Sequence, residues 1–63
     1  MKGKTVSVQC HYKAGTNQMY KFPQPVEMKI IEVLQQDGTD RMFGYIEEEL
    51  VYIEPSCIIK FIN

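Results

Sequence analysis

Valine and isoleucine dominate the aliphatic residues of this chain. Its 63 residues include five valines and seven isoleucines, against one alanine and two leucines. Because β-branched side chains lose rotamer freedom in a helix and pack well on a pleated sheet, this composition favours strands. A chain of this length makes one domain, residues 1–63, and buries only about 60% of the surface that its unfolded form exposes. We therefore expect a single small all-β domain of marginal stability.

The clearest pattern is a strict alternation of apolar and polar side chains over residues 4–12. The apolar members are Val6, Val8, Cys10 and Tyr12. Such alternation is typical of an antiparallel strand that rests one face on a core. His11 follows Cys10 and points to the opposite face, so we expect an exposed histidine.

Residues 25–36 are compatible with two structures. As a helix, they would have a proline in the first turn and Asp37-Gly38 as the stop signal. As a strand, their alternation slips by one residue at Ile30-Ile31, which is what a β-bulge produces. Asp37-Gly38 then marks the tip of a hairpin between two apolar runs. We predict the strand, and an α+β fold with a helix at 25–36 is the alternative.

The other segments complete a sheet of five short strands. We expect strands in residues 42–46, 50–53 and 58–62, loops in residues 13–18 and 35–41, and a one-turn 3-10 helix near residues 55–57. Residues 19–22 form a short extended piece, and Pro23 and Pro25 confine this part of the chain to a sheet edge or a crossover. Five strands in so short a chain enclose a core only as a strongly bent antiparallel sheet or a barrel.

The tail of the chain, residues 51–62, resembles the end of SH3-like small β-barrels. It runs as a strand, a 3-10 turn that contains Pro55-Ser56, and a closing strand. The resemblance implies an SH3-like barrel as the form of the bent sheet. Because the chain has no tryptophan and its first strand lacks the aromatic-acidic motif of signalling SH3 domains, the resemblance implies no binding residues.

The residues that usually carry catalysis or bind metals are few. Cys10 and Cys57 lie in apolar stretches, so we expect two buried thiols in a reducing compartment, with a disulfide between them as the less favoured alternative. His11 is the only histidine, and it has no metal-ligand spacing to the cysteines. We expect no enzyme activity, no metal and no cofactor.

The apolar stretches of the sequence do not resemble a membrane-spanning segment or a secretory signal. No run approaches the roughly 18 apolar residues of a transmembrane helix. The first residues, MKGK, lack the apolar region of a secretory signal. We expect a cytoplasmic protein with no membrane contact.

Charge is divided along the chain. Residues 1–31 carry five lysines against one glutamate, a net charge of +4, and residues 32–63 carry two basic against seven acidic residues, a net charge of −5. This division fits ion pairing between the two halves of one molecule. It also fits a dipolar surface that attracts a charged partner.

The aromatic and proline-containing segment 19–25 and the acidic turn 47–49 are the expected binding region. The prolines stiffen the segment, so it would present its side chains at low entropic cost. The candidate partner-binding residues are Met19, Tyr20, Lys21, Phe22, Glu47, Glu48 and Glu49. We expect a non-catalytic β-barrel adaptor that binds a protein partner.

Three other roles for these residues stay open. The N-terminal lysines, with Tyr12, Tyr20 and Phe22 interleaved, would bind the phosphates and bases of a nucleic acid. Unpaired strand edges and the divided charge would support a self-assembling homo-oligomer. In a purely structural role, Met19 and Phe22 would fold back and close the open end of the barrel.

Overall fold

The computed structural model describes residues 2–16 and 18–63; Asn17, in the predicted 13–18 loop, lies outside the described residues. The elements are β1 (Thr5–Lys13), β2 (Met19–Lys29), β3 (Glu32–Gln36), β4 (Thr39–Ile46), β5 (Glu49–Ile53), the 3-10 turn η1 (Pro55–Cys57) and β6 (Ile58–Phe61). The all-β prediction and the 3-10 turn are confirmed. The alternative helix at 25–36 is wrong, because residues 25–29 belong to β2 and residues 32–36 form β3. The single strand predicted there is therefore two strands, and over residues 2–16 and 18–63 the sheet has six strands, one more than predicted. Within the described residues, no helix is long and apolar enough to cross a bilayer.

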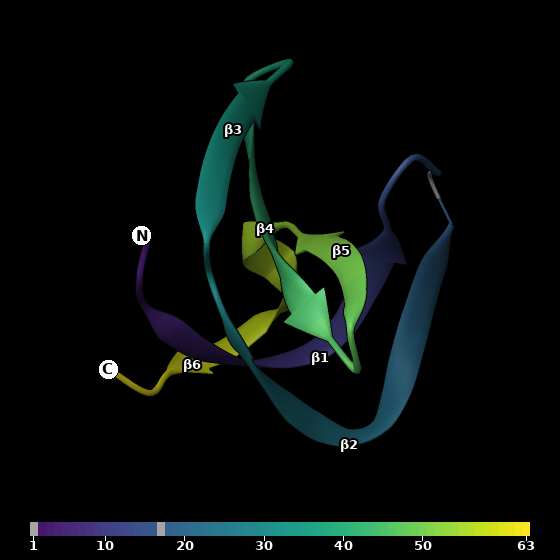
Figure 1. Ribbon diagram of the computed structural model, residues 1–63, viewed down its shortest axis with the longest axis vertical. Helices are drawn as coiled ribbons and strands as arrows, with labels where there is room; N and C mark the ends of the chain where they lie inside the picture. The colour runs from purple at the N-terminus through teal and green to yellow at the C-terminus, as the bar shows by residue number, and fades with distance from the viewer. Residues whose placement is uncertain (1, 17) are drawn as a thin grey trace.

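The strands form one antiparallel sheet in the order β2-β1-β5-β4-β3 (Figure 1). β1 shares its second edge between two strands: Tyr12 and Lys13 pair with β5, and residues 6–8 pair with β6. The first strand of the chain therefore contacts three others and organises the fold.

The sheet bends sharply where β2 passes into β3. The amide of Ile30 donates to the Lys4 carbonyl at 2.8 Å, and the amide of Ile31 donates to the Phe43 carbonyl at the same distance. Within one peptide unit, the chain leaves the β1 side and joins β4. The phase slip at Ile30-Ile31, predicted as a β-bulge within one strand, is instead the corner of the strongly bent sheet at which β2 ends and β3 begins. β2 and β3 form no ladder with each other, so hydrogen bonds do not close the sheet.

A large bulge in β2 interrupts the ladder between β1 and β2. Val8 pairs with Val26, and Cys10 pairs with Lys21. The single β1 residue between them therefore faces residues 22–25 of β2. Two of these four residues are prolines, which have no N–H group to leave unpaired. The predicted edge position is confirmed, but the separate pieces predicted on either side of the prolines are one continuous strand.

β3 and β4 form the predicted hairpin. Its tip is Asp37-Gly38, with φ angles of 54° and 78°. Both values lie in the left-handed region that a two-residue hairpin loop of this kind requires. The ladder reaches Gln36 and resumes at Thr39, so the predicted loop at 35–41 is too long.

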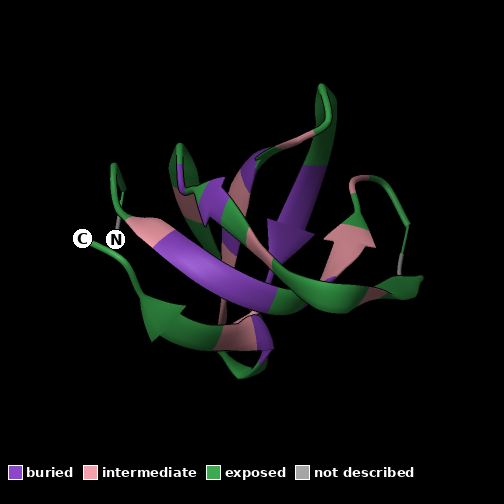
Figure 2. Cartoon of the chain, turned by 90° about the horizontal axis from the view of Figure 1, so that it is seen from below, coloured by how far each residue is buried: buried purple, intermediate pink, exposed green. Residues whose placement is uncertain are grey.

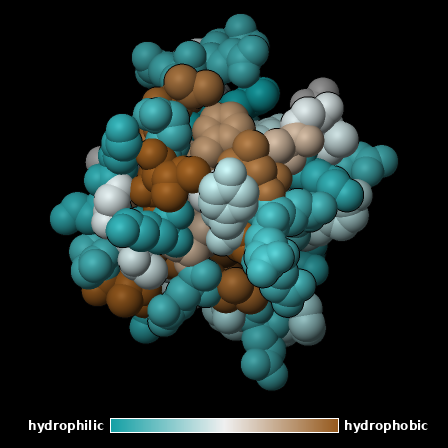
Figure 3. Space-filling view, viewed as in Figure 1, coloured by the Kyte–Doolittle hydropathy of each residue, from teal (hydrophilic) through white to brown (hydrophobic). Residues whose placement is uncertain are grey.

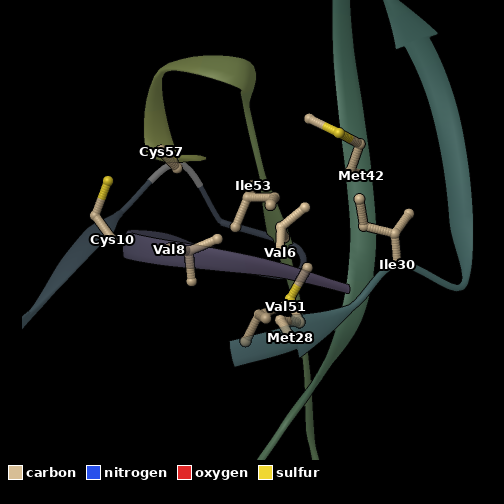
Figure 4. Packing of buried hydrophobic residues seen from close by; sticks show 9 residues of the cluster. All are labelled: Val6, Val8, Cys10, Met28, Ile30, Met42, Val51, Ile53 and Cys57. Atoms are coloured by element: carbon tan, nitrogen blue, oxygen red, sulfur yellow. The ribbon is translucent and has the colours of Figure 1, made fainter. Parts of the chain in front are cut away.

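The core lies inside the bend of the sheet (Figures 2 and 4). Its members are Val6, Val8, Cys10, Met28, Ile30, Met42, Val51, Ile53 and Cys57. The apolar face predicted for the first strand is confirmed, since its members are buried or pack against this cluster. The opposite face is not uniformly exposed, because Ser7 is buried as well. Cys10 and Cys57 are both buried free thiols.

Candidate functional site

A groove of about 860 Å³ opens between the β2 bulge and the turn that joins β4 to β5. Residues 22–27 line one side, residues 45–47 and Glu49 line the other, and His11 lies between them. The walls come from segments about twenty residues apart in the chain. We call this feature the bulge–turn groove.

The structure brings together part of the predicted binding region and excludes the rest. Phe22, Glu47 and Glu49 line the bulge–turn groove, so the aromatic segment and the acidic turn do face each other. Met19 is 47% exposed but lies outside the groove, as does Glu48.

Tyr20 and Lys21 also lie outside the groove. The Tyr20 hydroxyl donates to Oε1 of Gln18 at 2.8 Å. Lys21 lines a separate, smaller cavity of about 190 Å³ with Gln9, Cys10 and Phe22. The segment 19–22 therefore divides at Phe22 between two surfaces.

His11 is one of the groove residues that sequence reasoning missed. Its ring stacks on Phe22 at 4.7 Å between centroids and on Tyr20 at 5.6 Å. The side chain is partly buried, so the prediction of an exposed histidine is wrong. Burial lowers the pKa of His11 below its ordinary value of 6.5, and the charge of Glu49 acts in the opposite direction. The ring is therefore mostly neutral at pH 7 and acts as an aromatic surface.

Tyr45 was also missed as a lining residue, whereas Pro23 and Pro25 lie within the segment 19–25 that was expected to bind. Pro23 and Pro25 belong to the bulge, and Tyr45 is more than half exposed at the end of β4. Tyr45 was predicted only as a strand residue, and the prolines were predicted to stiffen the binding segment. Only the crossing of β2 and β4 places them on one surface, and no local sequence pattern carries that information.

Carboxylates give the bulge–turn groove a negative charge. Glu27, Glu47 and Glu49 all line it. Lys13 forms an ion pair with Glu49 at 3.3 Å, which offsets one of the three charges. In the part of the chain that the structure describes, Glu27 and Glu47 belong to no ion pair.

Part of the charge on the basic and acidic halves of the chain is paired within the molecule. Lys13–Glu49 and Lys2–Glu32, at 3.8 Å, each join a residue of the basic half to one of the acidic half. Both pairs are exposed and weak. Pairing within one molecule therefore leaves much of the charge pattern available to a partner.

The turn at the groove adopts a strained backbone. Glu47 and Glu48 have φ angles of 51° and 67°. L-residues other than glycine, asparagine and aspartate seldom adopt this left-handed region, at a cost of roughly 1–2 kcal/mol each. Two adjacent glutamates at this position also repel each other. Such an outlier is a reason to look for a function at the turn.

The aromatic residues elsewhere on the sheet pack against one another. Tyr12 stacks on Tyr52 with centroids 5.0 Å apart, and the Arg41 guanidinium lies 4.9 Å from the Tyr52 centroid. The Tyr52 hydroxyl donates to the Thr16 carbonyl at 3.1 Å, and Tyr12 donates to Glu54 at 3.3 Å. These interactions give Tyr12 a structural role in the sheet.

The cysteines and acidic residues form no reactive cluster in the described ranges. Among residues 2–16 and 18–63, no three His, Cys, Asp or Glu side chains could hold a metal ion together. Burial raises the pKa of Cys57 to about 11, so its thiol stays protonated at neutral pH.

Comparisons of the chain with protein-family models, with curated proteins and with solved structures return no match. The geometry and charge of the bulge–turn groove are therefore the basis for a functional argument.

Proposed function

We propose that this protein is a non-catalytic binding module that takes an extended segment of a protein partner into the bulge–turn groove. The observation that carries the proposal is the meeting of two segments, residues 22–27 and 45–49, across one groove. Each segment has a reason to bind before the fold is considered, because the first is aromatic and rich in proline and the second is acidic. In the folded chain the second segment is also strained.

The walls of the groove are held in place by the sheet. The Val8–Val26 and Cys10–Lys21 pairs fix the two ends of the bulge, and the prolines restrict the residues between them. The Ile46–Glu49 pair closes the opposite turn. A preorganised site loses little conformational entropy on binding, which favours affinity in a small domain.

The chemistry of the lining selects the partner. Phe22, His11 and Tyr45 offer aromatic surface. Glu27 and Glu47 offer carboxylates that pair with no cation among the described residues. An extended segment with apolar residues and at least one lysine or arginine complements both features. A segment of about eight extended residues spans about 26 Å, close to the 28 Å longest dimension of the domain.

The reactive groups support binding over catalysis. His11 stacks between two aromatic rings, and both thiols are buried. Two free thiols also suit a reducing compartment, which supports a cytoplasmic location for this binding module.

The proposal is tested by selecting ligands from a random peptide library on the immobilised protein and measuring the affinity of the selected peptides. We expect basic, apolar-containing peptides whose affinity falls about tenfold or more in Phe22→Ala, because that change removes an aromatic ring from the lining of the groove. Met19→Ala is the matched control, since Met19 belongs to the same segment but lies outside the groove.

Two results would overturn the proposal. Equal affinity of the selected peptides for the wild type and Phe22→Ala would place binding elsewhere. Salt-sensitive binding of single-stranded DNA at low salt, without any selected peptide, would favour the nucleic-acid alternative.

A further inference from the structure

The sheet has three edge strands, and they differ in how well they are protected from pairing with another chain. β2 carries the proline bulge along its edge, with a lysine at Lys21 and another at Lys29. Prolines, bulges and lysines are the usual means of blocking edge-to-edge association. β6 and β3 have no proline and no bulge of this size.

β6 is one of the two edges without a proline. It pairs with β1 on one side only, and its outer side faces open space in Figure 2. Ile59 is 48% exposed and Phe61 is 52% exposed. Apolar atoms are also visible at the lower left of Figure 3, where Figure 1 places β6 and the C-terminus. An apolar edge of this kind is a template for a further strand.

We propose that the further strand is β3 of a second copy of this chain, added antiparallel to β6. β3 pairs only with β4, so its outer edge is also open. It presents Leu34, which is 55% exposed, beside the exposed Ile31. Neither strand has a proline, and β6 carries only Lys60 and a one-residue bulge in its ladder with β1.

The proposed register is set by charge and by apolar side chains together. With Lys60 opposite Glu32 of a second copy, the antiparallel pairing places Phe61 opposite Ile31, Ile59 opposite Val33 and Ile58 opposite Leu34. One pair is of opposite charge and the other three are apolar, the kinds of cross-strand neighbours that stabilise a sheet. The intramolecular partner of Glu32 is Lys2 at 3.8 Å, an exposed ion pair that is easily exchanged.

Pairing of β6 with itself is less favourable. In the two-fold register that places Ile59 opposite Phe61, Lys60 lies opposite Lys60 of a second copy. Like charges directly opposite each other on neighbouring strands are destabilising. The charge pattern therefore selects the unlike edges, β6 and β3.

Because β6 and β3 are different edges, each copy that binds one neighbour through β6 still has a free β3 edge for another. Figure 1 shows β3 at the top of the molecule and β6 at the lower left, so one copy can use both edges at once. A head-to-tail contact of this type gives a ring if the rotation closes and a filament if it does not. Because four residue pairs bury little surface, the association is weak and depends on concentration.

The test is sedimentation or light scattering of the full chain from micromolar to millimolar concentration. We expect the wild type to associate, and Lys60→Glu and Glu32→Lys each to weaken association about tenfold by replacing an attractive pair with a repulsive one. The double variant restores the attractive pair, so it should regain association. Both residues are exposed, and circular dichroism verifies that each variant is folded.

Three outcomes would overturn the inference. The first is a wild type that stays monomeric at millimolar concentration. The second is an association that Glu32→Lys leaves unchanged, which would point to β6 pairing with itself. The third is a double variant that associates no better than the single variants. The bulge–turn groove is not involved in any of these measurements.

Discussion

A Cβ atom on Gly44 would lie 2.5 Å from the carbonyl oxygen of Lys29 and 2.9 Å from Cγ of Met28. β4 therefore crosses β2 at a distance that only glycine permits. This crossing closes the core at the bend of the sheet, and it also fixes the two strands that carry the opposite walls of the bulge–turn groove.

Gly44→Ala should lower the free energy of unfolding by about 1–3 kcal/mol, because the new methyl group forces the strands apart. Urea denaturation measures this change. Gly38→Asn is the matched control: Gly38 has open space around it and a positive φ that asparagine tolerates. A Gly44→Ala protein as stable as the wild type would show that the two strands are not held this closely.

The strained turn at Glu47-Glu48 predicts a trade between stability and binding. Replacing Glu47→Asn and Glu48→Gly should raise the free energy of unfolding by about 1–2 kcal/mol, because this pair favours the left-handed backbone of a tight hairpin turn. The same variant should bind basic peptides more weakly, since it removes the Glu47 carboxylate.

A second turn variant separates the two effects. Glu47→Asp with Glu48→Gly copies the Asp37-Gly38 turn of the same chain and keeps a carboxylate at position 47. It should be stabilised similarly but retain more peptide affinity. If neither variant is more stable than the wild type in urea, the turn is not strained.

The environment of His11 predicts a loss of stability in acid. Because burial lowers the folded-state pKa of His11, the unfolded chain takes up the proton first. The contribution of His11 to the free energy of unfolding is complete above about pH 6.5. It is lost as the pH falls through the pKa of His11 in the folded protein. His11→Phe keeps an aromatic ring against Phe22 and should lose less stability over this range in urea titrations. If the free energy of unfolding depends on pH equally in the wild type and in His11→Phe, the loss of stability in acid does not come from His11.

The buried thiol of Cys57 predicts a loss of stability in alkali. Burial raises its pKa from 9.0 to about 11, so the unfolded chain releases the proton first. The thiol contribution is complete below about pH 9 and is lost as the pH rises toward about 11. The Tyr12 pKa is also raised by burial and by Glu54, so the informative quantity is the difference between the wild type and Cys57→Ala. An equal pH slope in both proteins would contradict the prediction.

The local elements of the fold were predictable from sequence because short-range patterns determine them. The alternation around Val6 and Val8, the Asp37-Gly38 turn and the Pro55 3-10 turn each have a local cause. The slip at Ile30-Ile31 is also local, although its consequence, a corner at which the chain changes its partner strand, is a property of the whole sheet.

The site was only partly predictable because tertiary structure assembles it. The aromatic segment and the acidic turn indicated Phe22 and Glu47 as binding residues. The bulge of residues 22–25, however, depends on how β1 and β2 align over their full length. That alignment brings Phe22 onto His11 and leaves Met19 outside the groove. Tyr45 joins the site only because Gly44 lets β4 pass close to β2.

The most direct test of the bulge–turn groove is an NMR titration of the isotope-labelled protein. The probe is an extended peptide of about eight residues with one arginine and apolar neighbours, and the control is the same peptide with glutamate for arginine. We predict that the arginine peptide shifts the amide signals of His11, Phe22, Tyr45 and Glu47 in a saturable way, leaves the Asp37-Gly38 turn unchanged, and binds more tightly than the control. Saturable shifts confined to another surface, or equal binding of both peptides, would contradict the account.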